Sequence, residues 1–137
     1  MRFLFDASSI LEMIRGFEEE ATLRILSKNA VLDLTKYEVG NALWKEYVLR
    51  HVIGKSEFQE FLSLLRGVIL RTQAFSVKSE DLSEIAQVAA EERVTFYDAS
   101  YIDVARAHGL TLITEDEVLM KAASKHTKTA SVKEIRS

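Results

Sequence analysis

Short apolar runs alternate with longer stretches of helical periodicity along this chain. The short runs predict five β-strands, at residues 3–5, 30–34, 74–77, 110–113 and 129–135. Between them, apolar residues recur at helical spacing, which predicts helices over residues 8–16, 17–28, 36–50, 58–69, 80–92, 96–108 and 115–125. Phe17 falls on the buried face of the second predicted helix. This alternation is typical of an α/β fold, a three-layer α/β/α sandwich around a mostly parallel sheet.

Threonines that precede an acid by three residues mark the starts of three predicted helices. The pairs are Thr35 with Glu38, Thr95 with Asp98, and Thr114 with Glu117. This is the spacing of a capping box, in which the two side chains satisfy free N–H groups of the first turn. Each of these acids, taken singly, therefore has a structural role that is more common than metal ligation.

Four acids stand where an apolar run meets the start of a helix, namely Asp6, Glu38, Asp98 and Asp116. In a parallel sheet such junctions gather outside the carboxyl ends of the strands. Two like charges about 4 Å apart cost roughly 1 kcal/mol in water and roughly 4 kcal/mol at an effective dielectric of about 20. A bound cation would offset this repulsion. Hard oxygen ligands suit Mg²⁺ or Mn²⁺, which points to phosphate chemistry with metal-activated water.

Two of these acids differ from the rest. Asp6 ends an apolar run and is followed by serines that can cap the next helix, so capping does not explain it. Asp116 lies between Glu115 and Glu117, and the pattern alone leaves open which of the three is the fourth acid of the cluster.

The composition indicates one globular domain, residues 1–137, of ordinary size. The sequence has no Cys, which excludes a disulfide framework, a thiol nucleophile and a Cys-ligated zinc site. No apolar run approaches the roughly 18 residues of a membrane span, and the first five residues are too short for a signal-peptide core. We therefore expect a cytoplasmic protein that does not enter a membrane.

The net charge of −3 argues against a protein that binds nucleic acid over its whole surface. It leaves a nuclease possible, because a bound metal supplies local positive charge. Basic residues do gather from Lys45 to Arg71 and from Lys121 to Arg136. These strips are either solvated helix faces or contacts for phosphate groups.

The sequence lacks the residue patterns that several other kinds of site require. His51, His108 and His126 are isolated and show no metal-ligand spacing. Neither a G-x-S-x-G elbow nor a glycine-rich phosphate loop is present, so a serine hydrolase and a P-loop nucleotide site are both excluded.

Four blocks of the sequence carry a resemblance to a known family. Residues 5–10, 37–42, 97–109 and 110–116 read FDASSI, YEVGNA, YDASYIDVARAHG and LTLITED. In order and spacing they resemble PIN domains, and more narrowly the VapC-type toxins of toxin–antitoxin pairs, over nearly the whole chain. The resemblance implies a Mg²⁺- or Mn²⁺-dependent endoribonuclease with a PIN-like fold.

The resemblance also assigns residues and partners. Asp6, Glu38, Asp98 and Asp116 correspond to the catalytic, metal-binding acids, and Ser8 and Asn41 to positions that hold water or substrate. Asp103 is five residues past Asp98. Five residues turn a helix by about 500°, so Asp103 is expected to point roughly 140° away from Asp98 and from the site. The implied partners are an RNA substrate, a second copy of the chain in a homodimer, and a cognate antitoxin. The apolar segment 58–69 is a candidate contact surface or part of the core.

Two alternatives belong to other functional classes. A receiver-like signalling domain would need an Asp at the end of the third strand, where Ser76, Val77 and Lys78 stand instead. A non-catalytic α/β interaction module would keep the fold without turnover, and metal titration would distinguish it from an enzyme.

Overall fold

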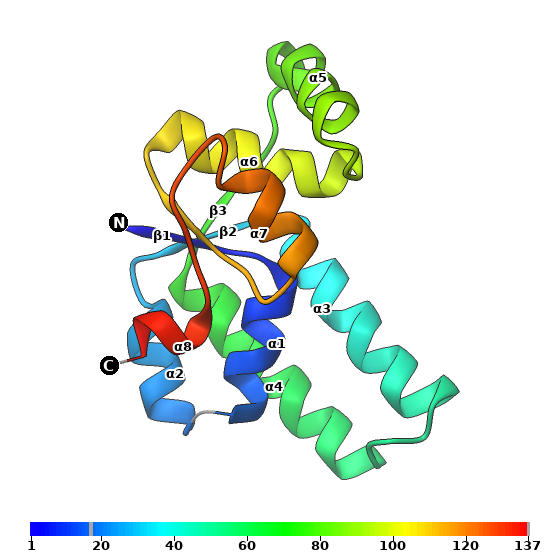
Figure 1. Ribbon diagram of the computed structural model, residues 1–137. Helices are drawn as coiled ribbons and strands as arrows, with labels where there is room; N and C mark the ends of the chain where they lie inside the picture. The colour runs from blue at the N-terminus through cyan, green and yellow to red at the C-terminus, as the bar shows by residue number, and fades with distance from the viewer. Residues whose placement is uncertain (17, 137) are drawn as a thin grey trace.

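Five parallel strands form the central sheet of the computed structural model, which describes residues 1–16 and 18–136 (Figure 1). The strands are β1 (Phe3–Phe5), β2 (Ala30–Leu32), β3 (Gln73–Phe75), β4 (Thr111–Ile113) and β5 (Thr129–Ala130). Their order across the sheet is β3-β2-β1-β4-β5. Every neighbouring pair is parallel, so the carboxyl ends of the strands lie at one edge.

Helices cover both faces of this sheet. On one face lie α5 (Leu82–Glu92), α6 (Phe96–His108) and α7 (Glu117–Ala123), and on the other α1 (Ala7–Gly16), α2 (Glu19–Leu26), α3 (Thr35–Trp44), α4 (Lys55–Arg71) and α8 (Val132–Ile135). Neighbouring residues of β1 divide between the two cores, Leu4 in the first and Phe5 in the second, because side chains alternate along a strand. The predicted three-layer α/β/α fold with a parallel sheet is confirmed.

A helical hairpin, called the arm below, extends from the sheet (Figure 1). It consists of α3, a π-helical segment η1 (Lys45–Leu49) and α4. The rings of Tyr47 and Phe58 stack across it with 4.8 Å between their centroids. Leu65 and Val68 of α4 are buried against the sheet, so the apolar segment of α4 serves in part as core.

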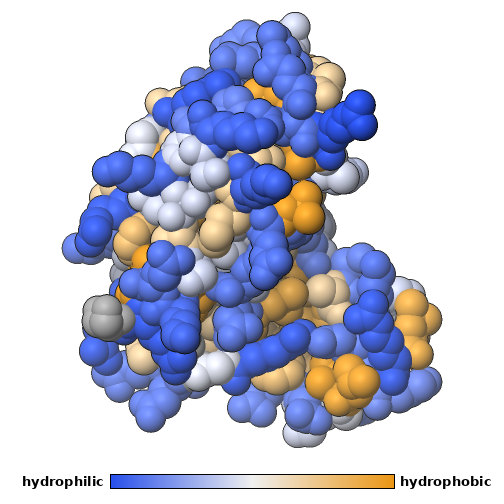
Figure 2. Space-filling view, in the orientation of Figure 1, coloured by the Kyte–Doolittle hydropathy of each residue, from blue (hydrophilic) through white to orange (hydrophobic). Residues whose placement is uncertain are grey.

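The far end of the arm, where η1 leads towards α4, carries exposed apolar side chains. Val48, Leu49 and Val52 are all exposed there. In the space-filling view, hydrophobic side chains gather at this end of the arm, whereas most of the same face is hydrophilic (Figure 2). The outline of the molecule is hollowed between the arm and α5 (Figures 1 and 2). The arm therefore projects from the sheet and forms one side of this hollow.

The end of the chain differs from its prediction. β5 stops at Ala130, and α8 replaces the continuation of the strand to residue 135. Ser131 caps α8, because its Oγ accepts the N–H of Glu134 at 3.3 Å and its own N–H donates to the Glu134 carboxylate at 3.0 Å. Val132 and Ile135 are three residues apart, a spacing that puts them on one face of a helix but on opposite faces of a strand.

Smaller differences affect other element boundaries. β2 ends at Leu32 instead of residue 34, and a 3₁₀ turn, η2 (Ser79–Asp81), precedes α5. Phe17, expected on a buried helix face, lies outside the described residues. None of the helices within 1–16 and 18–136 has the length and hydropathy that a bilayer crossing requires.

Candidate active site

Asp6 follows β1 at the carboxyl edge of the sheet and is only 5% exposed. Its Oδ1 accepts the Ser8 hydroxyl at 2.8 Å and the Ser9 N–H at 2.9 Å. Its Oδ2 accepts the hydroxyl of Thr114. The register explains this last contact, because Phe5 pairs with Ile113 and the next residue on each strand is then a neighbour. The sequence alone assigned no such role to Thr114.

Burial dominates the charge state of Asp6. It raises the pKa of this carboxyl, while the hydrogen bonds from Thr114, Ser9 and Ser8 lower it and offset the rise only in part. All three donors are neutral groups. Asp6 is therefore oriented by hydrogen bonds, but its negative charge is not neutralised by them.

Glu38 lies in the first turn of α3 and is held by a relay of hydroxyl groups. The Tyr101 hydroxyl, on α6, donates to Glu38 Oε1 at 2.7 Å and lies 2.7 Å from Thr35 Oγ1. Because the phenol has one proton, Thr35 donates to Tyr101, while Thr35 Oγ1 accepts the N–H of Leu32 at 3.0 Å. The predicted capping box of Thr35 and Glu38 is wrong: the N-cap residue is Leu34, and the Thr35 hydroxyl faces inward.

Tyr101 is a site-supporting residue that the sequence did not single out. Its side chain is 1% exposed, and burial, together with the Glu38 carboxylate, raises the pKa of its hydroxyl, so it stays a donor. At the third position after Asp98 it resembles any apolar core residue of a helix. The sequence held one signal of this role: a Tyr on a buried helix face, whose hydroxyl usually needs a polar partner.

Asp98 is the third residue of α6 and is half-buried. The predicted cap is confirmed, because Thr95 is the N-cap residue and its hydroxyl accepts the Asp98 N–H at 3.0 Å. Burial raises the pKa of the Asp98 carboxyl, and the charges of Asp116 and Asp6 raise it further. Burial also raises the pKa of Glu38; the Tyr101 hydrogen bond opposes this, and Asp6 and Asp98 add to the rise.

Asp116 is the N-cap residue of α7. Its Oδ1 accepts the N–H groups of Val118 at 2.9 Å and Leu119 at 3.1 Å. The expected capping by Thr114 and Glu117 is therefore wrong.

The neighbours of Asp116 are used differently. The Glu115 carboxylate accepts the N–H of Val132 at 2.7 Å, at the start of α8. Glu117 is an exposed first residue of α7. Of these three acids, Asp116 is the one whose charge acts on Asp98, so the fold brings together the same four acids that the sequence singled out.

Comparison with known proteins now identifies the family, since the sequence pattern of the PIN domain matches residues 3–125. The chain belongs to the PIN domain family. It is 37% identical over 121 residues to exonuclease VapC9 of Pyrobaculum aerophilum, covering 88% of this chain and 84% of that one. It is 30% identical over 123 residues to ribonuclease VapC3 of the same organism, covering 87% of this chain and 92% of that one. The predicted resemblance to VapC-type PIN domains is confirmed.

Solved structures show the same fold. The crystal structure of PAE2754 from Pyrobaculum aerophilum superimposes with a TM-score of 0.79 and 33% identity, covering 99% of this chain and 94% of that chain. The structure of FitAB bound to an IR36 DNA fragment superimposes with a TM-score of 0.63, covering 94% of each chain. At 14% identity, that second likeness concerns the fold alone.

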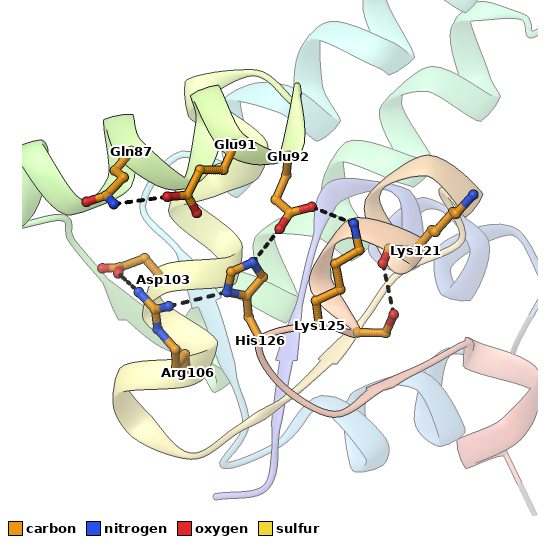
Figure 3. A network of polar contacts seen from close by, with 9 residues as sticks. Gln87, Glu91, Glu92, Asp103, Arg106, Lys121, Lys125 and His126 are labelled. Carbon is orange, nitrogen blue, oxygen red and sulfur yellow. Dashed lines mark hydrogen bonds and ion pairs between the residues drawn. The ribbon is translucent and has the colours of Figure 1, made fainter.

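The two predicted positioning residues occupy different surroundings in this PIN domain. Ser8 donates to Asp6, lies 3.2 Å from Thr114 Oγ1, and accepts the N–H of Glu115 at 2.9 Å. It therefore ties the end of β1 to the loop after β4. Asn41 is exposed on α3 and lines a cavity beside Glu38. Asp103 points away from the site, as predicted, and pairs with Arg106 at 3.0 Å (Figure 3).

The donor set of the acidic edge suits a divalent cation. None of the ion pairs in the described part of the chain involves Asp6, Glu38, Asp98 or Asp116. No three acid or His side chains there converge tightly enough to enclose an ion by themselves. That spacing is compatible with Mg²⁺ or Mn²⁺, which bind through one or two carboxylates and retain several waters.

Proposed function

We propose that this PIN domain is a Mg²⁺- or Mn²⁺-dependent endoribonuclease that hydrolyses phosphodiester bonds at the acidic edge of its sheet. The observation that carries the proposal is the gathering of Asp6, Glu38, Asp98 and Asp116 from four separate segments of the chain. Their negative charges repel one another, and the pKa values of Asp6, Glu38 and Asp98 are all raised. Helix capping alone would not require such a meeting of like charges.

The four acids divide into two pairs in this proposal. Asp6 and Asp98 are the principal metal ligands, with Glu38 and Asp116 ligating directly or through water. When bound, Mg²⁺ or Mn²⁺ lowers the pKa of water and offsets charge that develops on the phosphate. Ser8, Ser9 and Thr114 hold Asp6 in one orientation.

Glu38 and Asp116 are held as firmly. Tyr101 fixes Glu38 through its hydroxyl, and the first N–H groups of α7 fix Asp116. Groups that orient metal ligands in this way commonly set the affinity of the site.

The biological setting is a second part of the proposal. The relatives named VapC9 and VapC3 support a place in a toxin–antitoxin pair. In that setting residues 1–137 act as one PIN unit in the cytoplasm, pair with a second copy, and are inhibited by a cognate antitoxin. Light scattering at micromolar concentration tests the homodimer directly, and a monomeric mass would contradict it.

The test of the catalytic proposal is cleavage of a mixed RNA pool with Mn²⁺, with EDTA, and with Asp98→Asn. Cleavage should require Mn²⁺ and should be lost in Asp98→Asn with an unchanged circular dichroism spectrum. Glu117→Gln is the matched control, because it removes an exposed acid from the next helix start and should leave cleavage intact. Full Mn²⁺-dependent cleavage by Asp98→Asn would overturn the assignment.

A circular RNA separates the endonuclease proposed here from an exonuclease, the activity that the name of VapC9 gives. An endonuclease opens the circle, whereas an exonuclease needs an end and leaves it intact. Opening of the circle is expected here. If neither RNA is cut and no Mn²⁺ binds at millimolar concentration, the chain is a non-catalytic interaction module.

A further inference from the structure

A cavity of about 440 Å³ lies beside Glu38, between α1 and the arm. Besides Glu38, its charged and amide side chains are those of Arg15, Asn41, Lys45, Glu46 and Arg50. We call it the Lys45 pocket. Glu38 is thus shared between the acidic site on one side and a pocket that contains three cations on the other.

The charges in the Lys45 pocket are unequally paired. Arg15 forms an ion pair with Glu46, which cancels one charge of each sign. Neither Lys45 nor Arg50 takes part in an ion pair within residues 1–16 and 18–136. The chain carries a net charge of −3, so any attraction for an anion must come from a local concentration of cations such as this one.

The π-helical segment η1 brings these cations together. The N–H of Arg50 donates to the carbonyl of Lys45 at 2.9 Å, a separation of five residues. In an α-helix the residue above Lys45 would be Leu49, and Arg50 would point about 140° away. The wider turn instead brings Arg50 over Lys45, and leaves Leu49 58% exposed.

This turn continues the polar face of α3. Asn41 is three residues after Glu38 and four before Lys45, so all three follow one helix face. With Arg50 added, amide and cationic donors extend in one direction from the acidic site. The π segment forms the C-terminal end of the helix that begins as α3, and Lys45 and Arg50 at its two ends both line the pocket.

We propose that the Lys45 pocket binds a phosphate group of the RNA strand, next to the bond that lies at the acidic site. This inference rests on the proposed ribonuclease function. Lys45 contributes a compact charge and Arg50 a planar guanidinium that can donate two parallel hydrogen bonds to phosphate. The Asn41 amide adds a neutral donor between them and Glu38.

Binding of a fluorescent single-stranded RNA to metal-free protein tests the pocket without catalysis. In EDTA, the double variant Lys45→Gln/Arg50→Gln should bind roughly tenfold more weakly than the unaltered chain. The slope of log Kd against log salt concentration should fall by about 0.7 for each phosphate that the variant no longer neutralises. Lys55→Gln is the matched control, since it removes an exposed cation from the same arm outside this pocket.

Further measurements separate this proposal from its rivals and from the nuclease assignment. Lys45→Arg should retain binding. Arg50→Lys should keep the salt slope but lose part of the affinity, because an ammonium group cannot donate two parallel hydrogen bonds to one phosphate. The Mn²⁺ affinity of the double variant should not fall. In Mn²⁺, the double variant should raise KM and leave kcat nearly constant. If RNA is never cleaved but the affinity and salt slope respond as stated, the pocket stands and the proposed function fails.

Two results would overturn the proposal. One is an RNA affinity and salt slope in the double variant equal to those of Lys55→Gln. The other is displacement of the RNA by a glutamate-rich peptide of equal charge and concentration, dependent on Lys45 and Arg50, which would assign the pocket to a protein partner.

Discussion

Two groups of charged side chains in this PIN domain differ in how their charges are paired. The first is the acidic site, where carboxylates from the end of β1 and the starts of α3, α6 and α7 meet. The second, called the Glu92 network, joins α5 and α6 to the turn after α7 (Figure 3). Glu92 accepts hydrogen bonds from Lys125 Nζ at 3.0 Å and from His126 Nε2 at 2.8 Å. Arg106 contacts Glu84, Asp103 and His126 Nδ1.

The pairing within the Glu92 network is nearly complete. A guanidinium group can only donate, so His126 Nδ1 accepts from Arg106 and His126 Nε2 carries the hydrogen that reaches Glu92. The His126 and Lys125 hydrogen bonds lower the pKa of Glu92. In the acidic site, the pKa values of Asp6, Glu38 and Asp98 are raised.

The opposite directions of these shifts distinguish the two regions. Carboxylates that serve the fold are neutralised by side chains of the same molecule. Carboxylates that are oriented by neutral hydroxyl and N–H groups, and that repel one another, gain most from an external cation. Perturbed pKa values of this kind cluster at functional sites, although ion-pair networks also produce shifts, which is why the direction matters here.

The largest expected effect is the loss of activity in Asp6→Asn. The amide can keep most of the hydrogen bonds of the buried site, but it removes the charge that holds a metal. Several kcal/mol of metal-derived stabilisation correspond to about 10²- to 10³-fold in kcat/KM. Steady-state cleavage of RNA in Mn²⁺ measures it, with Glu92→Gln as the partner variant from the other region. An equal loss of activity in both variants would remove the functional distinction between the two regions.

Metal binding should stabilise the fold through the acidic site alone. Mn²⁺ at about 100 times its Kd adds about 2.7 kcal/mol to the free energy of unfolding. Thermal melts with and without EDTA measure this gain. The rise in Tm should persist in Glu92→Gln and disappear in Asp6→Asn. A rise that survives in Asp6→Asn would place the cation elsewhere in the molecule.

Tyr101→Phe tests whether orientation of a carboxylate matters apart from its charge. The phenyl ring fills the same buried space, and only the hydroxyl between Thr35 and Glu38 is removed. Loss of such an orienting group lowers metal affinity by about tenfold or more, while the missing hydrogen bond costs about 1 kcal/mol of stability. Calorimetric titration with Mn²⁺ measures the affinity, and urea unfolding in EDTA measures the stability. Unchanged Mn²⁺ affinity together with reduced stability would restrict Tyr101 to a structural role.

Local patterns predicted the strands, most helix starts and the places of Asp6, Glu38 and Asp98 at element boundaries, because each depends on neighbours in the sequence. The apolar run Phe3–Phe5 ends at Asp6, and Thr95 caps the helix that carries Asp98, without reference to distant residues. The direction of the Thr35 hydroxyl could not be predicted in this way. It depends on Tyr101, which is 66 residues away.

Other features also required the three-dimensional structure. Asp116 can be told from Glu115 as the fourth acid only in the structure, where the Glu115 carboxylate accepts the N–H of Val132 at the start of α8. That helix was itself predicted as a strand. The π turn that brings Arg50 over Lys45 has no signature in the local sequence, so the Lys45 pocket could be described only as a basic strip.

The smallest expected effect is a difference in the sign of two pH dependences, measured by urea unfolding in EDTA between pH 7 and about pH 3. Glu92 has a lowered pKa in the folded state. It therefore stabilises the fold above its unfolded pKa, and this contribution is lost as the pH falls through the folded pKa. Glu92→Gln should be less stable than the unaltered chain at pH 7, and the difference should shrink in acid.

Asp98 should behave in the opposite way. Its pKa is raised in the folded state, chiefly by burial and then by Asp116 and Asp6. Between the unfolded and folded pKa values the native state binds more protons, so stability falls as the pH rises through this window. Asp98→Asn should therefore be more stable than the unaltered chain at pH 7 without metal, and the gain should vanish in acid. If both variants shift stability in the same direction at pH 7, the carboxylates of the two regions do not differ in how well the fold neutralises them, and the contrast between the two regions fails. Opposite signs would mean that the fold alone disfavours the charge of Asp98, which a bound cation would then compensate.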